Sequence, residues 1–277
     1  MNRWLVTAAE LAQRQRSDTV VIADCRFALA DTGLGERQYA QAHIPGARYL
    51  HLDRDLSGAK GTHGGRHPLP AAAHFEALLQ GLGVDSEPPT LIVAYDDSRF
   101  AFASRLWWLL RYFGHDNVRV LDGGYAAWVA AGLPVSAAVP ATGAPGNFRA
   151  RPRPELVVNR DEVLALDARS ALVDSREEAR YQGLEEPIDP VAGHIDGALN
   201  QPWQQATAAS GLLLDEAAQR QRWGDIAERD DIVVYCGSGV TACVNLLSLA
   251  AIGRDDARLY SGSWSDWCSY LDKPEKN

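Results

Sequence analysis

Cysteine is scarce in this sequence of 277 residues, which contains only four. None belongs to a Cys-x-x-Cys pair, the spacing typical of zinc sites, and four scattered cysteines are too few for a disulfide scaffold. Basic residues are also outnumbered, because 27 Lys and Arg face 36 Asp and Glu and leave a net charge of −9. That charge argues against nucleic acid or an anionic membrane as the main partner, so any anionic ligand needs a local positive site.

Long apolar runs are absent as well. No stretch is long enough to cross a bilayer, and the segment that follows Met1 lacks the apolar core of a signal peptide. The sequence therefore predicts no membrane partner and a cytoplasmic location. The apolar content of 46% and the charged content of 23% are typical of a soluble globular protein with a substantial core.

The sequence does contain a regular alternation of strand and helix signals. Apolar, β-branched runs at 20–23, 91–95 and 232–234 alternate with segments of helical period. This spacing predicts βαβ units, with mainly parallel sheets flanked by helices on both faces. Thr7 and Glu10 have the spacing of a capping box, which predicts the start of the first helix.

The second half of the chain repeats the first. Four motifs recur in the same order, and their two copies are Asp24-Cys25-Arg26 with Asp174-Ser175-Arg176, His43-Ile44 with His194-Ile195, Tyr95-Asp96 with Tyr235-Cys236, and Trp128 with Trp267. Such order predicts a duplicated domain. We expect domains over 1–138 and 156–277, joined by a Pro-, Gly- and Ala-rich linker over 139–155. Because Asp96 stands at the position of Cys236, the first domain is expected to be inactive.

Cys236 occupies the most informative stretch of the chain. It follows a predicted buried strand and precedes a predicted helix that opens at Thr241, so backbone N–H groups should converge on it. Those donors and the helix dipole favour an anion, which should make the Cys236 thiolate easier to form than in a free thiol. Gly237 and Gly239 let the backbone curl around the sulfur. Cys236 is therefore our candidate nucleophile.

These features resemble the two-domain rhodanese-type sulfurtransferases over nearly the whole chain. The motifs that carry the resemblance are His-Ile-Pro-Gly-Ala at 43–47, Trp-Trp at 107–108, Leu-Asp-Gly-Gly at 121–124, Asp-Ser-Arg at 174–176, Arg-Tyr at 180–181, Gly-His-Ile at 193–195 and Cys-Gly-Ser-Gly-Val-Thr at 236–241. The resemblance implies two tandem rhodanese-like domains. It also implies that Cys236 takes a sulfur from an anionic donor and holds it as a persulfide, without metal or organic cofactor. Cyanide, a small thiol or a thioredoxin-like protein would then accept that sulfur.

The resemblance also implies roles for other residues. Arg180 matches an arginine that binds the anionic end of the donor, and Ser238 matches a serine beside the nucleophile. Asp53 matches a first-domain aspartate that reaches this serine, and His67 matches a first-domain histidine near the donor. The implied site thus lies at the domain interface. The loop from Gly237 through Ser238, Gly239 and Val240 to Thr241 would bind the donor and the persulfide.

The donor itself is left open between two candidates. The six-residue loop 236–241 resembles that of 3-mercaptopyruvate sulfurtransferases, which favours 3-mercaptopyruvate. Those enzymes usually carry a second donor-binding arginine nine residues after the position of Arg180, where this sequence has Asp189. That segment is closer to the enzymes that use thiosulfate.

Several recurring residues are interpreted as structural. We expect His43 and His194 to hold equivalent turns through their rings. The repeated Asp-Arg motifs at 24–26 and 174–176 should form buried ion pairs, and the tryptophans should pack in cores and interfaces. Cys25, Cys243 and Cys268 lack a setting like that of Cys236, and the thiol of Cys243 falls inside a predicted helix.

Two other classes of protein share part of this pattern, namely protein tyrosine phosphatases and inactive rhodanese-fold modules. A protein tyrosine phosphatase needs Cys-x5-Arg, and the sixth residue after Cys236 is Ala242. An inactive rhodanese-fold module that only binds partners would leave Cys236 idle, although its Gly-Ser-Gly-Val-Thr loop is complete. The expected state of the chain is a monomer or a weak dimer.

Overall fold

The computed structural model describes residues 2–17, 19–141 and 143–271, which form two compact units. The first unit contains the chain up to Ser57 together with Pro70–Arg153 and Thr207–Leu213, and the second contains Gly58–Leu69, Pro154–Ala206 and the chain from Leu214 onward. Two short segments therefore pack away from their sequence neighbours: Gly58–Leu69 belongs to the second unit, and Thr207–Leu213 belongs to the first. Most of the predicted linker, through Arg153, belongs to the first unit, where Phe148 is buried.

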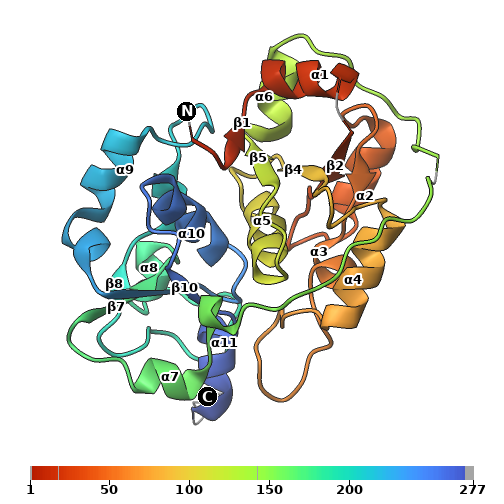
Figure 1. Ribbon diagram of the computed structural model, residues 1–277. Helices are drawn as coiled ribbons and strands as arrows, with labels where there is room; N and C mark the ends of the chain where they lie inside the picture. The colour runs from red at the N-terminus through yellow and green to blue at the C-terminus, as the bar shows by residue number, and fades with distance from the viewer. Residues whose placement is uncertain (1, 18, 142, 272–277) are drawn as a thin grey trace. The chain divides into compact units, whose positions relative to one another are not determined.

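The first unit is built on a five-stranded parallel sheet with the strand order β1-β5-β4-β2-β3 (Figure 1). Its strands are β1 (Leu5–Val6), β2 (Val20–Asp24), β3 (Arg48–Tyr49), β4 (Leu91–Tyr95) and β5 (Val118–Leu121). Its helices are α1 (Ala8–Ser17), α2 (Leu34–Gln41), α3 (Leu52–Asp55), α4 (Ala72–Gly81), α5 (Ala103–Tyr112) and α6 (Gly124–Ala130). The capping box at Thr7 and Glu10 is confirmed, because each side chain accepts the backbone N–H of the other residue.

The second unit is also built on a five-stranded parallel sheet, with the order β6-β10-β9-β7-β8. Its strands are β6 (Val157–Val158), β7 (Ser170–Asp174), β8 (Leu199–Asn200), β9 (Asp231–Tyr235) and β10 (Arg258–Tyr260). Its α-helices are α7 (Arg160–Leu164), α8 (Glu178–Tyr181), α9 (Glu216–Trp223), α10 (Ala242–Ala251) and α11 (Ser263–Trp267). Short 3-10 helices are η1 (Pro154–Leu156), η2 (Trp203–Ala206), η3 (Gly224–Glu228) and η4 (Cys268–Tyr270).

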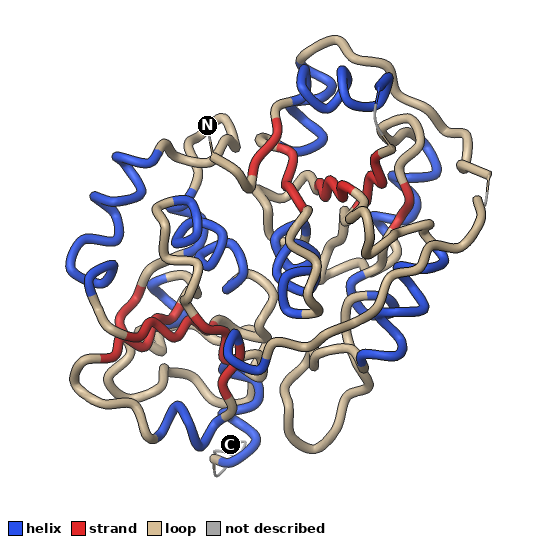
Figure 2. The backbone as a smooth tube through the Cα atoms, in the orientation of Figure 1, coloured by secondary structure: helices blue, strands red, loops and turns tan. Residues whose placement is uncertain are grey.

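The two units have the same topology, since each strand of the second sheet takes the place of a strand of the first in the same order. Figure 2 shows the strands of each unit as a central layer with helices around it. Corresponding tyrosines end the central strands: the Tyr95 hydroxyl accepts the Ile44 N–H at 3.3 Å, and the Tyr235 hydroxyl accepts the Ile195 N–H at 3.1 Å. The predicted duplication of a parallel α/β domain is confirmed.

The residues interpreted as structural behave as expected. His43 Nδ1 lies 2.7 Å from the Tyr39 carbonyl oxygen, and His194 Nδ1 lies 2.7 Å from that of Tyr181, so each ring holds its turn. Buried ion pairs join Arg26 to Asp24 and Arg176 to Asp174, both at 2.6 Å. Six of the tryptophans are buried in the cores, namely Trp4, Trp107, Trp108, Trp128, Trp223 and Trp264. No helix in the described part of the chain is long and apolar enough to cross a membrane.

One buried histidine makes the stability of the first unit depend on pH. His115 is only 3% exposed, and its Nε2 donates to the Thr90 carbonyl oxygen at 2.8 Å. Burial lowers the pKa of His115 from its ordinary value, although that hydrogen bond opposes the change. The unfolded chain therefore binds the proton more tightly, so the contribution of His115 to stability is complete above the ordinary pKa of about 6.5 and is lost as the pH falls from there to the lower pKa of the folded state.

We expect acidification from pH 7.5 to 5.5 to cost the wild type about 1 kcal/mol more stability than it costs the His115→Gln variant. Urea denaturation at both pH values measures the difference. His74 is exposed, so His74→Gln provides the control and should keep the wild-type dependence on pH. Equal slopes for the wild type and His115→Gln would contradict the assignment.

Candidate functional site

Cys236 lies where β9 ends and the loop leading to α10 begins, and its side chain is buried at 1% exposure. The apolar, β-branched residues of β9 are buried in the sheet, which brings the chain to this edge. The Cys236 N–H donates to Ser263 Oγ at 3.1 Å, and its carbonyl oxygen accepts the Trp264 N–H at 3.0 Å. The turn from β10 into α11 therefore fixes the backbone of the candidate nucleophile.

The loop after Cys236 depends on glycine at position 239. Gly239 has φ of +75°, a left-handed conformation that side chains with a Cβ adopt at a cost. A Cβ at this position would also collide with the Ser261 carbonyl oxygen. Thr241 directly precedes α10, whose residues from Ala242 to Ala250 are all buried. The loop can thus wrap tightly around the end of β9 before the helix starts.

The first unit shows what such a loop does with an anion. Asp96 takes the place of Cys236 and is 2% exposed. Its carboxylate accepts four backbone N–H groups, from Ser98 at 2.9 Å, Phe100 at 3.1 Å, Phe102 at 2.9 Å and Ala103 at 2.9 Å. Burial raises the pKa of Asp96, and these N–H bonds oppose the rise. The loop of the first unit therefore directs four backbone N–H donors at the side chain that follows β4.

The corresponding N–H groups of the second unit follow from the repeat, since Asp96 matches Cys236. They belong to Ser238, Val240, Ala242 and Cys243. By this comparison, a negatively charged sulfur attached to Cys236 would meet the N–H groups of Ser238, Val240 and Ala242, whereas the Cys243 N–H already donates to the Val240 carbonyl oxygen at 3.0 Å. The predicted binding loop from Gly237 to Thr241 includes the first two of these positions, and the comparison adds Ala242, the first residue of α10.

Two guanidinium groups lie beside the loop, from Arg66 and Arg180. A Cβ built on Gly237 would lie 3.0 Å from Arg66 Nη2, 3.4 Å from Arg180 Nη1 and 3.5 Å from Arg180 Nη2. Burial lowers the pKa of Arg66, and the neighbouring charges of Cys236 and Arg180 act on it in opposite directions. Both cations are therefore within electrostatic reach of the residue next to Cys236. Arg180 was predicted here from the sequence, and Arg66 was not.

Buried carboxylates hold these guanidinium groups. Asp189 forms an ion pair with Arg66 through Oδ1 and one with Arg180 through Oδ2, the latter at 3.2 Å. Glu186 pairs with Arg180 at 2.7 Å and with Arg176 at 3.2 Å. The side chains of Glu186 and Asp189 are 4% and 2% exposed. Together with the Asp174–Arg176 pair they form a chain of alternating charge that ends at Arg66 and contains Asp174, Arg176, Glu186, Arg180, Asp189 and Arg66.

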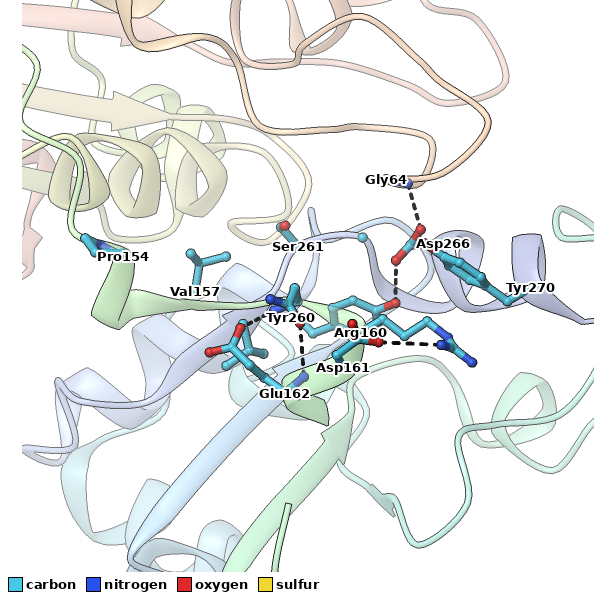
Figure 3. A pocket seen from close by; sticks show the side chains of 13 residues that line it. Gly64, Pro154, Val157, Arg160, Asp161, Glu162, Tyr260, Ser261, Asp266 and Tyr270 are labelled. Atoms are coloured by element: carbon cyan, nitrogen blue, oxygen red, sulfur yellow. Dashed lines mark hydrogen bonds and ion pairs between the residues drawn. The ribbon is translucent and has the colours of Figure 1, made fainter. Parts of the chain in front are cut away.

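The segment that carries Arg66 is anchored within the second unit. Asp266 accepts the Gly64 N–H at 2.7 Å and the Tyr260 hydroxyl at 2.6 Å, as Figure 3 shows. The Arg66 N–H donates to Ser265 Oγ at 3.1 Å, so the backbone of Arg66 is itself held. The cavity drawn in Figure 3 has a volume of about 510 Å³ and does not include Cys236 among its lining residues.

His67 contacts Ser238, so two of the residues expected near the donor lie together. His67 Nδ1 lies 2.8 Å from Ser238 Oγ, and the two residues are 5% and 7% exposed. The expectation that His67 would be a first-domain residue is corrected, because segment Gly58–Leu69 belongs to the compact unit that contains Cys236. The reason is the anchoring of this segment by Asp266 and Ser265, which the sequence pattern does not reveal.

Asp53 lies in α3 of the first unit and is partly buried. Its N–H donates to His51 Nδ1 at 3.1 Å, so His51 caps this short helix. The predicted reach of Asp53 to Ser238 stays a prediction.

The remaining cysteines differ from Cys236 in their surroundings. All are buried and free. Burial raises the pKa of Cys268 to about 11 and that of Cys25 well above its ordinary value, so both remain thiols near neutral pH. The Cys243 thiol lies 3.5 Å from the Gly239 carbonyl oxygen, at the start of α10. Arg66 and Arg176 also lie within electrostatic reach of Cys268, but burial outweighs their effect on the pKa of its thiol.

Three comparisons with known proteins agree with this geometry. The family model described as "Rhodanese-like domain" matches residues 7–131 and 159–270. A Pseudomonas aeruginosa protein, provisionally named 3-mercaptopyruvate sulfurtransferase, is 42% identical, with 98% of this chain and 96% of that protein covered. A Mycobacterium tuberculosis protein, provisionally named thiosulfate sulfurtransferase SseB, is 38% identical, with 98% and 95% covered.

The solved structures include a similar chain of the same extent. It is the crystal structure of SseA from Escherichia coli, which is described as having the rhodanese fold and belonging to the 3-mercaptopyruvate sulfotransferases. It superposes with a TM-score of 0.82 at 32% identity, and the match covers 95% of this chain and 99% of that one.

Proposed function

Since this chain belongs to the rhodanese-like family and is a sulfurtransferase, we propose that it carries sulfur from 3-mercaptopyruvate to an acceptor on Cys236. The observation that carries the proposal is the setting of Cys236. It lies at the end of β9 in a loop of the anion-binding kind, with the guanidinium groups of Arg66 and Arg180 beside Gly237. This setting supports Cys236 as the nucleophile, its loop as the group that binds the persulfide, and the two guanidinium groups as the donor site.

In the first half-reaction, the Cys236 thiolate attacks the thiol sulfur of 3-mercaptopyruvate. The bond between carbon and sulfur breaks, and its electrons remain on the carbon, which takes up the proton of the donor thiol. The products are pyruvate and the Cys236 persulfide anion. The persulfide would be stabilised by the N–H groups of the loop from Gly237 to Thr241, as the Asp96 carboxylate is by the corresponding loop of the first unit.

In the second half-reaction, a thiophilic acceptor attacks the outer sulfur of the persulfide. With cyanide the products are thiocyanate and the free Cys236 thiolate, and a small thiol or a thioredoxin-like protein would accept the sulfur in the same way. The two half-reactions predict ping-pong kinetics. Because all four cysteines are free, we place this chemistry in a reducing compartment, the cytoplasm.

We assign the remaining residues supporting roles. Arg180 would bind the donor carboxylate, because a planar guanidinium matches the geometry of a carboxylate. Ser238, whose hydroxyl contacts His67, would orient the donor beside the sulfur. Asp53 would complete this set from the first unit. The whole reaction, as proposed, needs no metal or organic cofactor.

A second donor, thiosulfate, is favoured by one observation, the presence of Asp189 where 3-mercaptopyruvate sulfurtransferases usually carry an arginine. Thiosulfate carries its charge on a sulfonate-like group, and its transfer would leave sulfite and the same persulfide. The two donors thus share the intermediate and differ in the anionic end that the protein must bind.

Intact mass spectrometry after incubation with each donor tests the proposal. We expect 3-mercaptopyruvate to add one sulfur, about 32 Da, to the wild-type chain, and cyanide to remove it. We also expect kcat/KM to be higher with 3-mercaptopyruvate than with thiosulfate. A higher kcat/KM with thiosulfate would make thiosulfate the preferred donor. If neither donor forms an adduct, the proposal is overturned and a binding module is favoured.

A further inference from the structure

We infer that Arg66 is a donor-binding residue of this enzyme and that Asp189 is the positioning residue that directs both Arg66 and Arg180 at the donor. The inference rests on the proposed function, since it names the groups that would recognise a carboxylate at the same site. It adds a residue that lies far from Arg180 in the sequence and that the sequence motifs did not indicate.

The first observation is the direction of the two guanidinium groups. Arg66 uses Nη1 for its ion pair with Asp189, and Nη2 is the atom nearest to Gly237. Arg180 uses Nε and Nη2 for Glu186 and Nη2 for Asp189, and Nη1 is its atom nearest to Gly237. Within the described residues, Arg66 Nη2 and Arg180 Nη1 donate to no protein acceptor. Each arginine is thus bound at one end and presents the other end to the catalytic loop.

The second observation is that one carboxylate joins the two arginines. Asp189 contacts Arg66 with Oδ1 and Arg180 with Oδ2, and its side chain is only 2% exposed. A buried carboxylate shared by two cations fixes both of them at once, because leaving either pair costs an uncompensated charge. The N–H groups of Ile188 and Asp189 donate to Glu186, which rigidifies the segment that carries Asp189.

The third observation is the space at position 237. Because this residue is glycine, the guanidinium of Arg66 can approach within 3.0 Å of the place where a Cβ would stand. The Arg66 side chain is 26% exposed, and its backbone is tied to Ser265. These contacts place a fixed, partly exposed cation beside the residue that follows Cys236.

Two N–H donors from different arginines match the two oxygens of a carboxylate, one donor to each oxygen. This arrangement explains how a segment with Asp189 can serve a carboxylate donor. The aspartate does not bind the donor itself, and instead it holds in place the guanidinium of Arg66, which supplies the second positive group.

The test compares the kinetics of Arg66→Gln and Arg66→Lys with the wild type, using 3-mercaptopyruvate as donor and cyanide as acceptor. Losing one charge-assisted hydrogen bond should raise the donor KM about 10- to 100-fold and leave kcat within about threefold. Arg66→Lys keeps the positive charge, so its donor KM should lie between that of the wild type and that of Arg66→Gln. The inhibition constant of the product pyruvate, which is a binding readout, should rise in parallel with KM.

Arg258→Gln is the matched control. Arg258 is also 26% exposed and paired with an aspartate, Asp231. It is the first residue of β10, and Asp231 is the first residue of β9, whereas Cys236 follows the last residue of β9. The donor KM of Arg258→Gln should stay at the wild-type value. If Arg66→Gln and Arg66→Lys match this control in KM and in pyruvate inhibition, the role of Arg66 is overturned. A wild type that forms no persulfide would instead overturn the proposed function.

The positioning role of Asp189 is tested by a double-mutant cycle. We expect Asp189→Asn to raise the donor KM in the wild-type background by more than it does in the Arg66→Gln background, because part of its effect passes through Arg66. Equal factors in both backgrounds, or no increase in either, would show that Asp189 does not act through Arg66.

Discussion

The Cys236→Ser variant is expected to transfer sulfur more slowly than the wild type by a factor on the order of 10⁴ or more, because it lacks the nucleophile. A serine hydroxyl at this position is a far weaker nucleophile than a thiolate and cannot form a persulfide. The hydrogen bonds that hold Cys236 to Ser263 and Trp264 use its backbone N–H and carbonyl oxygen, so they do not depend on the sulfur. The fold should therefore persist, and steady-state turnover with 3-mercaptopyruvate and cyanide measures the loss.

Cys25→Ser is the matched control for this prediction. Cys25 is also 1% exposed, and the second copy of its motif already has a serine, Ser175, in its place. This variant should keep wild-type turnover and still gain a single sulfur. Residual activity of Cys236→Ser close to that of the control would mean that another group carries the sulfur.

The Arg176→Met variant is expected to lose about 3–5 kcal/mol of stability, since it leaves the buried Asp174 carboxylate without its cation and takes from Glu186 one of its two cations. The Arg176 side chain is 1% exposed and binds Asp174, Glu186 and the Gly193 carbonyl oxygen. Burial disfavours its charge, but the hydrogen bonds to Asp174 and the attraction of Asp174 and Glu186 together outweigh burial and raise the pKa of Arg176. Denaturant unfolding followed by tryptophan fluorescence measures the loss.

The same change should raise the donor KM, because Glu186 joins Arg176 to Arg180. Arg26→Met separates the two effects. Arg26 makes the equivalent buried pair with Asp24 in the first unit, so its variant should also be destabilised and yet keep its donor KM. If both variants lose stability and neither changes KM, the ion-pair chain supports the fold alone.

The fold of this chain follows from its sequence to a large extent. The repeated motifs ending in Asp96 and Cys236 gave the duplication, and the period of the apolar residues gave the parallel sheets. The sequence pattern places segment 58–69 in the wrong unit. Its true place depends on single hydrogen bonds, which the Gly64 N–H donates to Asp266 and the Arg66 N–H donates to Ser265. Such bonds join residues about two hundred positions apart and leave no periodic pattern.

The candidate site was predicted in part for the same reason. Cys236 and its loop are local in the sequence, and the contact of His67 with Ser238 agrees with their expected closeness. Arg66 was missed although it stands directly before His67. The sequence motif for a second arginine lies at position 189, where this chain has an aspartate. Only the folded chain shows that Asp189 pairs with Arg66, which belongs to a distant loop.

The ion-pair chain from Asp174 to Arg66 has a consequence for how a donor reaches Cys236. Its three guanidinium groups and three carboxylates cancel, and the whole protein carries a net charge of −9. An approaching anion is therefore not steered from afar, because beyond a Debye length of about 8 Å a neutral set of charges exerts little pull. Capture depends on the few N–H groups that point outward at contact. With the donor site proposed above, we expect the donor to be selected by the direction of hydrogen bonds rather than by attraction over distance.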